Sequence, residues 1–158
     1  MADLRRAIAR DRIGHAYLFL GPEGIGRRTL AVLFAQAMLC EAGGERPCDS
    51  CRSCLLVKAG THPDLSAVEP EGGTLRIEQM RSVRSRVAYK PMLGKRRVFL
   101  LAEMERMTEA AANSFLLTLE EPPPGVVFVG WAPADALLLP TILSRCQVSA
   151  LRPLSVSA

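Results

Sequence analysis

The sequence predicts an α/β domain built on a parallel β-sheet with helices on both faces. Short apolar runs alternate along the chain with segments of helical periodicity, and a glycine-rich turn joins the first run to the first helix. The 158 residues are enough for one domain, which we place at 1–158. With 49% hydrophobic and 23% charged residues, the composition excludes a disordered tail.

Each expected element has its own signal. The expected strands are short apolar runs bounded by glycine, proline or polar residues, and they cover 15–20, 64–68, 98–101, 126–129 and 147–151. Apolar residues at helical spacing predict helices over 28–40 and 76–87. Thr108 is expected to cap a third helix that stops before Pro122, and Pro140 divides a helical region over 134–143.

The chain shows no targeting or membrane segment. It has no run of about eighteen apolar residues, and its N-terminus lacks the apolar core of a signal peptide. We therefore expect a cytoplasmic protein without membrane contact. The formal net charge of +4 permits a nucleic-acid partner without indicating one.

The turn after the first expected strand has the glycine skeleton of a phosphate-binding loop. The loop and the residues that follow it are Gly21, Gly24, Gly26, Arg27, Arg28 and Thr29. A hydrolytic loop needs a lysine for the β- and γ-phosphates and a serine or threonine for Mg²⁺. Arginines fill both positions, so the sequence leaves open whether the loop still binds ATP or ADP or is a structural turn.

The strand over 98–101 ends where a nucleotide hydrolase carries its second acidic motif. An aspartate there holds Mg²⁺ and a following glutamate orients the attacking water. Ala102 stands at the aspartate position, and only Glu103 remains of the motif. Glu103 alone is equally explained as a solvated carboxylate at a strand end.

Four cysteines form the strongest local signal. They lie within an insertion at about 40–60, and polar residues between them argue against a set of buried apolar side chains. Four thiolates can close a tetrahedral shell around Zn²⁺ with no open position, so the pattern predicts a structural zinc site, with an iron–sulfur cluster as the alternative. The expected ligands are Cys40, Cys48, Cys51 and Cys54.

The segment 76–97 is rich in positive charge. It holds six arginines and two lysines. A solvated helix face explains this pattern, and a contact with DNA phosphates or with a partner subunit is the alternative.

Two longer motifs carry a family resemblance. Residues 112–123 read ANSFLLTLEEPP and residues 139–147 read LPTILSRCQ. Together with 15–22, the cysteine insertion and 76–81, they resemble the clamp-loader subunits of bacterial DNA polymerase III, which are AAA+ proteins with a P-loop fold. The resemblance implies a three-layer P-loop domain with a small zinc insertion. It also implies that the lid and collar domains of the family are absent from 1–158.

That family has motor subunits, called gamma or tau, and a non-motor subunit, called delta-prime. Arg27, Arg28 and Ala102 depart from the motor pattern, whereas Ser144-Arg145-Cys146 keeps the family motif, so the chain looks similar to the delta-prime class. The resemblance implies a subunit that does not hydrolyse ATP and belongs to a ring with gamma/tau and delta. Such a subunit helps to load the sliding clamp onto primed DNA within the polymerase holoenzyme, and Arg145 would act in trans as an arginine finger.

Two other functions remain open from the sequence. The chain could be an active gamma/tau-like ATPase in which Arg27 replaces the lysine and Glu103 works without the aspartate. It could also be a zinc-bearing DNA-binding module. Measurable ATP hydrolysis would distinguish the active ATPase from a non-motor subunit. Salt-dependent DNA binding by the chain alone would identify the DNA-binding module.

Overall fold

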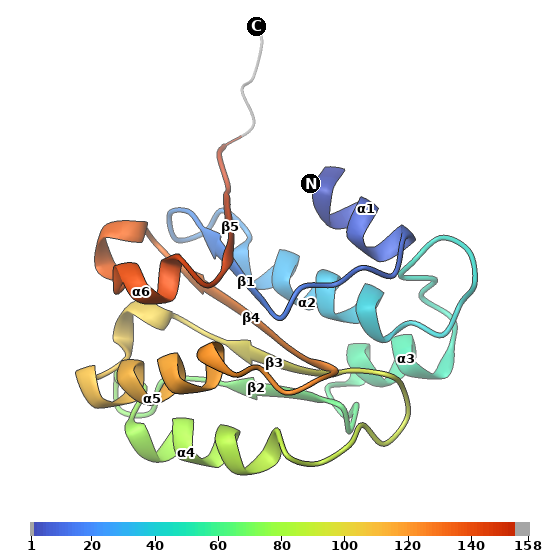
Figure 1. Ribbon diagram of the computed structural model, residues 1–158. Helices are drawn as coiled ribbons and strands as arrows, with labels where there is room; N and C mark the ends of the chain where they lie inside the picture. Colours follow the sequence, from blue (N-terminus) through green and yellow to red (C-terminus); the bar gives the residue numbers. More distant parts are fainter. Residues whose placement is uncertain (1, 154–158) are drawn as a thin grey trace, which may run out of the picture.

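Five parallel strands form the central sheet of the computed structural model, which describes residues 2–153 (Figure 1). Their order across the sheet is β2-β3-β4-β1-β5, and every neighbouring pair is parallel. The strands are β1 (Ala16–Leu20), β2 (Leu65–Val68), β3 (Arg97–Leu101), β4 (Val126–Ala132) and β5 (Gln147–Ala150). All five expected strands are confirmed. β4 extends past the expected end at 129 because residues up to Ala132 remain buried and paired with β1.

Helices cover both faces of this sheet, which confirms the predicted three-layer arrangement. One face carries α1 (Ala2–Ala9), α2 (Arg27–Leu39) and α3 (Arg52–Ala59), and the other carries α4 (Ile77–Arg86), α5 (Glu109–Glu120) and α6 (Pro140–Leu143) (Figure 1). Two short 3₁₀ segments, Met104–Arg106 and Asp135–Leu137, complete the elements. None of the helices between residues 2 and 153 is long and apolar enough to cross a membrane.

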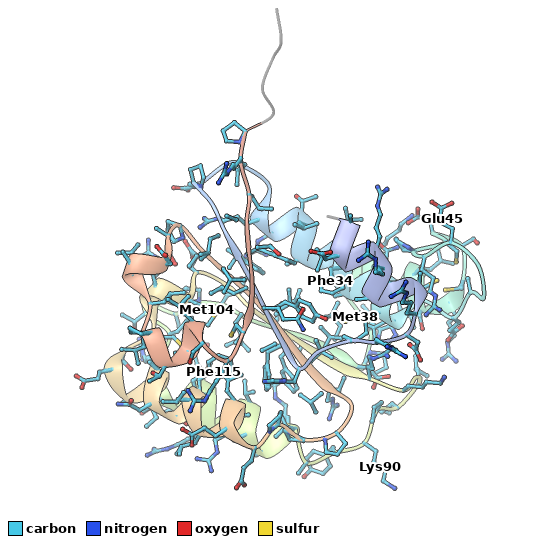
Figure 2. All side chains as sticks on the ribbon, turned by 45° about the horizontal axis from the view of Figure 1, so that its top comes forward. Phe34, Met38, Glu45, Lys90, Met104 and Phe115 are labelled. Atoms are coloured by element: carbon cyan, nitrogen blue, oxygen red, sulfur yellow. The ribbon has the colours of Figure 1, made fainter. Side chains whose placement is uncertain are left out.

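Each face of the sheet has its own apolar core. Phe34 and Met38 of α2 lie on one side, and Met104 and Phe115 lie on the other (Figure 2). Phe115 packs edge-on against Phe128 of β4, with ring centroids 5.2 Å apart. Because both faces of every central strand are buried, the strands are apolar runs without alternation, which is why the sequence shows them clearly.

Two helices are absent from the sequence prediction. α1 has only eight residues and buries Leu4 alone, which is too little periodicity to recognise. α3 begins inside the cysteine insertion, where Cys51 is its N-cap and accepts the N–H of Cys54. The predicted cap at Thr108 is confirmed, since the Thr108 hydroxyl accepts the N–H of Ala111 at the start of α5. Residue 1 and residues 154–158 of the predicted 1–158 domain lie outside the described part of the chain.

Candidate functional site

The glycine loop lies at the carboxyl end of β1 and leads directly into α2. Gly24 and Gly26 have left-handed backbone conformations, with φ angles of 85° and 99°. A Cβ atom at either position would meet nothing within 4 Å, so backbone conformation rather than space favours glycine there. Gly21 ties the loop to the sheet by donating its N–H to the carbonyl of Ala132, at 3.2 Å. This is the strand–loop–helix geometry of a phosphate-binding loop.

The two arginines after the loop have different surroundings. Arg27 is 8% exposed, and its buried Nη1 has no hydrogen-bond partner among residues 2–153. Arg28 is an exposed residue that forms an ion pair with Glu69, and its guanidinium lies 5.4 Å from the ring centroid of Trp131. Arg28 therefore offers a cation, and not an oxygen ligand, at the position where a hydrolytic phosphate-binding loop carries its serine or threonine.

Ala102 and Glu103, at the position of the second acidic motif, lie at the same end of the sheet as the glycine loop. β1, β3 and β4 are parallel, so the residues that follow β1 and those that follow β3 lie at the carboxyl ends of the strands. Ala102 is 1% exposed and offers no ligand atom. Glu103 has a left-handed φ of 50° and is paired with Arg106 at 3.5 Å. The structure thus places the glycine loop and Glu103 at the same end of the sheet, with an alanine at position 102.

The four cysteines converge at the far end of α2. Their sulfur atoms all lie within 4.8 Å of one another, and two of the Sγ–Sγ distances are 3.9 Å. A tetrahedron with metal–sulfur bonds of 2.3 Å has edges of about 3.8 Å, so this spacing fits a single metal ion. Cys40 and Cys54 are buried and Cys48 and Cys51 are partly exposed.

Backbone N–H groups surround these sulfur atoms. Cys51 donates its N–H to the Sγ of Cys48 at 3.3 Å, and Ala42 donates to the Sγ of Cys40 at 3.4 Å. Such bonds favour thiolates, and those from Ser50 and Cys51 lower the pKa of Cys48 to about 6. Burial raises the pKa of Cys54 to about 12. A metal cation bound among the sulfur atoms would displace the thiol proton of Cys54. The four cysteines would then bind the cation as thiolates.

Arg145 lies at the amino ends of the strands, whereas the glycine loop lies at their carboxyl ends. Arg145 lies two residues before β5, which runs parallel to β1 with Gln147 paired with Tyr17. Its Nη1 donates to the carbonyl of Thr141 at 2.9 Å, and its Nη2 lies 3.5 Å from a carboxylate oxygen of Glu120. Both charged side chains of that pair are more than a third exposed, at 36% and 44%. The pair is a surface ion pair with a single contact.

Much of the positive charge over 76–97 is used within the chain. The Arg86 guanidinium lies 5.5 Å from the centroid of Phe99 and donates to Ser66, and Arg97 donates to the carbonyl of Arg86 at 3.0 Å. These contacts favour a structural role for Arg86 and Arg97 over their participation in a continuous positive surface that binds DNA phosphates.

A buried polar network next to the cysteines is absent from the sequence prediction. The carboxylate of Asp64, which is 0% exposed, accepts the backbone N–H groups of Met92, Leu93 and Gly94. His62 is also buried; its Nδ1 accepts the N–H of Asp64 and its Nε2 contacts the Ser53 hydroxyl in α3. The only signal in the sequence is a histidine and an aspartate directly before an apolar strand, because the three donors lie 28–30 residues downstream.

Comparison with known proteins agrees with this geometry. Residues 1–155 match the family model described as DNA polymerase III, delta subunit. The chain is 36% identical over 155 residues to the DNA polymerase III subunit delta' of Bacillus subtilis, covering 98% of this chain and 47% of that protein. It is also 37% identical over 145 residues to the subunit tau/gamma of Haemophilus influenzae, covering 90% of this chain and 21% of that protein.

A solved structure has a fold similar to that of this chain. The gamma subunit-related protein of Thermotoga maritima superposes with a TM-score of 0.73 at 28% identity, covering 96% of this chain and 45% of that one. The chain thus spans less than half the length of these relatives. The resemblance inferred from the motifs over 112–123 and 139–147 is confirmed, and the chain belongs to the DNA polymerase III delta subunit family.

Proposed function

We propose that this chain is a non-hydrolysing AAA+ subunit of a DNA polymerase III clamp loader. In this proposal it assembles with gamma/tau and delta subunits in the cytoplasm and completes the ATP site of a neighbouring subunit. The complex then loads the sliding clamp onto primed DNA during replication. Family membership and the delta' and tau/gamma names of its relatives support the assembly.

The altered residues around the loop support the absence of hydrolysis. Catalysis of phosphoryl transfer needs Mg²⁺ to neutralise the charge that develops on the phosphates. Magnesium takes oxygen ligands, and here an arginine and an alanine stand where two of those ligands belong. The Arg28 guanidinium offers no oxygen ligand, and Glu103 alone cannot supply both of the missing ligands.

The position of Arg145 is the observation that carries the proposed role in trans. β5 runs parallel to β1 for four residues, and Arg145 precedes it while the glycine loop follows β1. A strand of that length spans about 13 Å, so Arg145 and the loop of the same chain lie at opposite ends of the two strands. The exposed contacts with Glu120 and with the Thr141 carbonyl do not hold the side chain firmly, because an exposed ion pair contributes only about 0.2–1 kcal/mol and a hydrogen bond about 0.5–1.5 kcal/mol. A phosphate bound to a neighbour can therefore compete for the guanidinium.

The four cysteines complete the proposal as a structural zinc site. Four thiolate ligands leave no open position for catalysis, and Zn²⁺ prefers this tetrahedral sulfur set. The bound ion would hold the segment after α2 against α3, where few apolar residues are available to do so.

ATP turnover by the purified chain tests the absence of hydrolysis. We expect no release of phosphate with Mg²⁺ present, and no change when Glu103→Gln is introduced. Turnover that disappears in the Glu103→Gln variant would identify an active motor subunit instead. Restoring the motor residues by Arg27→Lys, Arg28→Thr and Ala102→Asp together should add magnesium-dependent nucleotide binding.

A further inference from the structure

One edge of β2 has no partner strand within residues 2–153. β2 is the outermost strand in the sheet order and pairs only with β3, and Figure 1 shows it beside α4. The carbonyl of Val68 accepts the N–H of Ala102 at 3.0 Å, so Val68 faces the side of β3. Because neighbouring residues of a strand direct their backbone groups to opposite edges, Ala67 faces the open edge.

Three backbone groups along this open edge are available to another chain. Leu65 lies two residues before Ala67 and therefore shares its direction. No hydrogen bond within residues 2–153 uses the carbonyl of Leu65, the N–H of Ala67 or the carbonyl of Ala67. Ala67 is also exposed, so an incoming strand can reach these groups. Such a row of unpaired groups is a template for one more strand.

A groove of about 710 Å³ lies between this part of β2 and α4. It is lined by residues 67–71, which end β2 and follow it, and by four residues of α4, Glu78, Gln79, Ser82 and Arg86. A helix beside a strand edge gives an added strand side-chain contacts as well as backbone hydrogen bonds. The groove therefore has the form of a site for an extended peptide.

The groove carries more negative than positive charge. The charged residues that line it are Glu69, Glu71, Glu78 and Arg86. Glu69 is already in an ion pair, and the Arg86 guanidinium is held by contacts with β2 and β3. Glu71 and Glu78 are exposed and form no ion pair within residues 2–153. The neighbouring Arg76 donates to the backbone carbonyl of Glu71 and not to its carboxylate.

We infer that this groove binds an extended segment of a partner protein that carries lysine or arginine, added as a further strand beside β2. The backbone of that segment would pair with Leu65 and Ala67, and a cationic side chain would reach Glu71 or Glu78. A second copy of this chain fits less well, because two β2 edges would bring the same carboxylates together. The inference does not depend on the proposed role in a clamp loader.

Fluorescence anisotropy with the purified chain and a labelled eight-residue peptide of alternating valine and lysine tests this groove. We expect saturable binding of one peptide per chain, although the net charge of +4 disfavours a cationic peptide elsewhere on the surface. The same peptide N-methylated at every residue keeps its charge but donates no backbone hydrogen bonds. It should bind about 10-fold more weakly or worse. A peptide of alternating valine and glutamate should not bind.

Variants of the groove separate the backbone contribution from the charge contribution. Ala67→Pro removes one N–H at the open edge and leaves the bonds with β3 in place, so it should weaken the lysine peptide about 10-fold. Glu71→Gln together with Glu78→Gln should weaken it about 2- to 30-fold, as expected for two exposed ion pairs. Glu45→Gln with Glu121→Gln removes two exposed carboxylates outside the groove and should bind the peptide like the parent chain.

Urea unfolding of Ala67→Pro shows whether this variant is folded. Unchanged peptide binding by a folded Ala67→Pro chain would overturn the inference, and so would equal binding of the N-methylated peptide or no binding of the lysine peptide. If Ala67→Pro does not fold, the N-methylated peptide and the double glutamate variant decide the question. Light scattering of the chain alone adds a further check, because a dimer that Ala67→Pro dissociates would show that a second copy occupies the edge and would overturn the inference.

Discussion

Replacing Asp64 by alanine removes the acceptor for three backbone N–H groups in the segment between α4 and β3. The carboxylate oxygens lie 2.6, 2.8 and 3.2 Å from the N atoms of Met92, Leu93 and Gly94. Asp64 is 0% exposed, so its carboxylate depends on these three donors and not on water. We expect the variant to lose the anchor that holds this segment beside the cysteine cluster.

The size of the loss follows from the number and burial of the bonds. Hydrogen bonds to a charged group contribute about 1.5–3 kcal/mol each, but three bonds to one carboxylate are not additive. The exposed donors of Met92 and Gly94 can regain water after the substitution, which lowers the cost. We therefore expect Asp64→Ala to reduce the free energy of unfolding by about 3 kcal/mol, a large part of the 5–15 kcal/mol typical of a domain. Asp64→Asn keeps one acceptor oxygen and should cost about half as much.

Urea unfolding followed by circular dichroism, with Zn²⁺ present, measures this difference. Hydrogen exchange should show faster exchange of the amides at 92–94 in the variant. Asp135→Ala is the matched control, because it removes an exposed aspartate and should change stability by less than about 0.5 kcal/mol. A cost for Asp64→Ala as small as that of the control would refute the assignment of Asp64 as the anchor.

Two further predictions concern the cysteines and a loop glycine. Elemental analysis should find one zinc ion per chain, which Cys54→Ser should remove and Cys146→Ser should leave in place; an unchanged zinc content in Cys54→Ser would exclude the site. Gly125→Ala should cost about 1–3 kcal/mol in urea unfolding, because Gly125 has a φ of 76° and a Cβ there would lie 3.0 Å from the carbonyl oxygen of Lys95. Unchanged stability of that variant would contradict the left-handed conformation.

The centre of the sheet could be predicted from the sequence because β1, β3 and β4 are buried on both faces. Apart from His15 at the start of the first run, the runs 15–20 and 98–101 consist of apolar and aromatic residues, and the glycines at 21–26 mark the first turn. The cysteine spacing likewise predicts a cluster, which the sulfur positions confirm. α3 was missed because Cys51 acts both as a cluster residue and as the N-cap of a helix.

Contacts between distant segments could not be predicted in the same way. The sequence shows Arg145 and Glu120 but not that α5 ends beside the turn before β5, where the two side chains meet. The strand order β2-β3-β4-β1-β5 places β5 beside β1, and no local pattern encodes that order. The burial of Arg27 is of the same kind, because it depends on packing around the whole N-terminus of α2.

ATP hydrolysis by a clamp loader reconstituted with the protein that carries this chain tests the role of Arg145 most directly. Arg145→Ala should assemble normally, since it breaks only an exposed ion pair and exposed hydrogen bonds to Thr141 and Ser144. It should slow hydrolysis at the neighbouring site about 10³-fold or more. Arg145→Lys should restore only part of the rate, because a point charge lacks the planar fork of a guanidinium. Arg84→Ala, an exposed arginine of α4, is the control and should hydrolyse ATP at the parent rate. An Arg145→Ala complex with unchanged hydrolysis and unchanged clamp loading would contradict the proposed role.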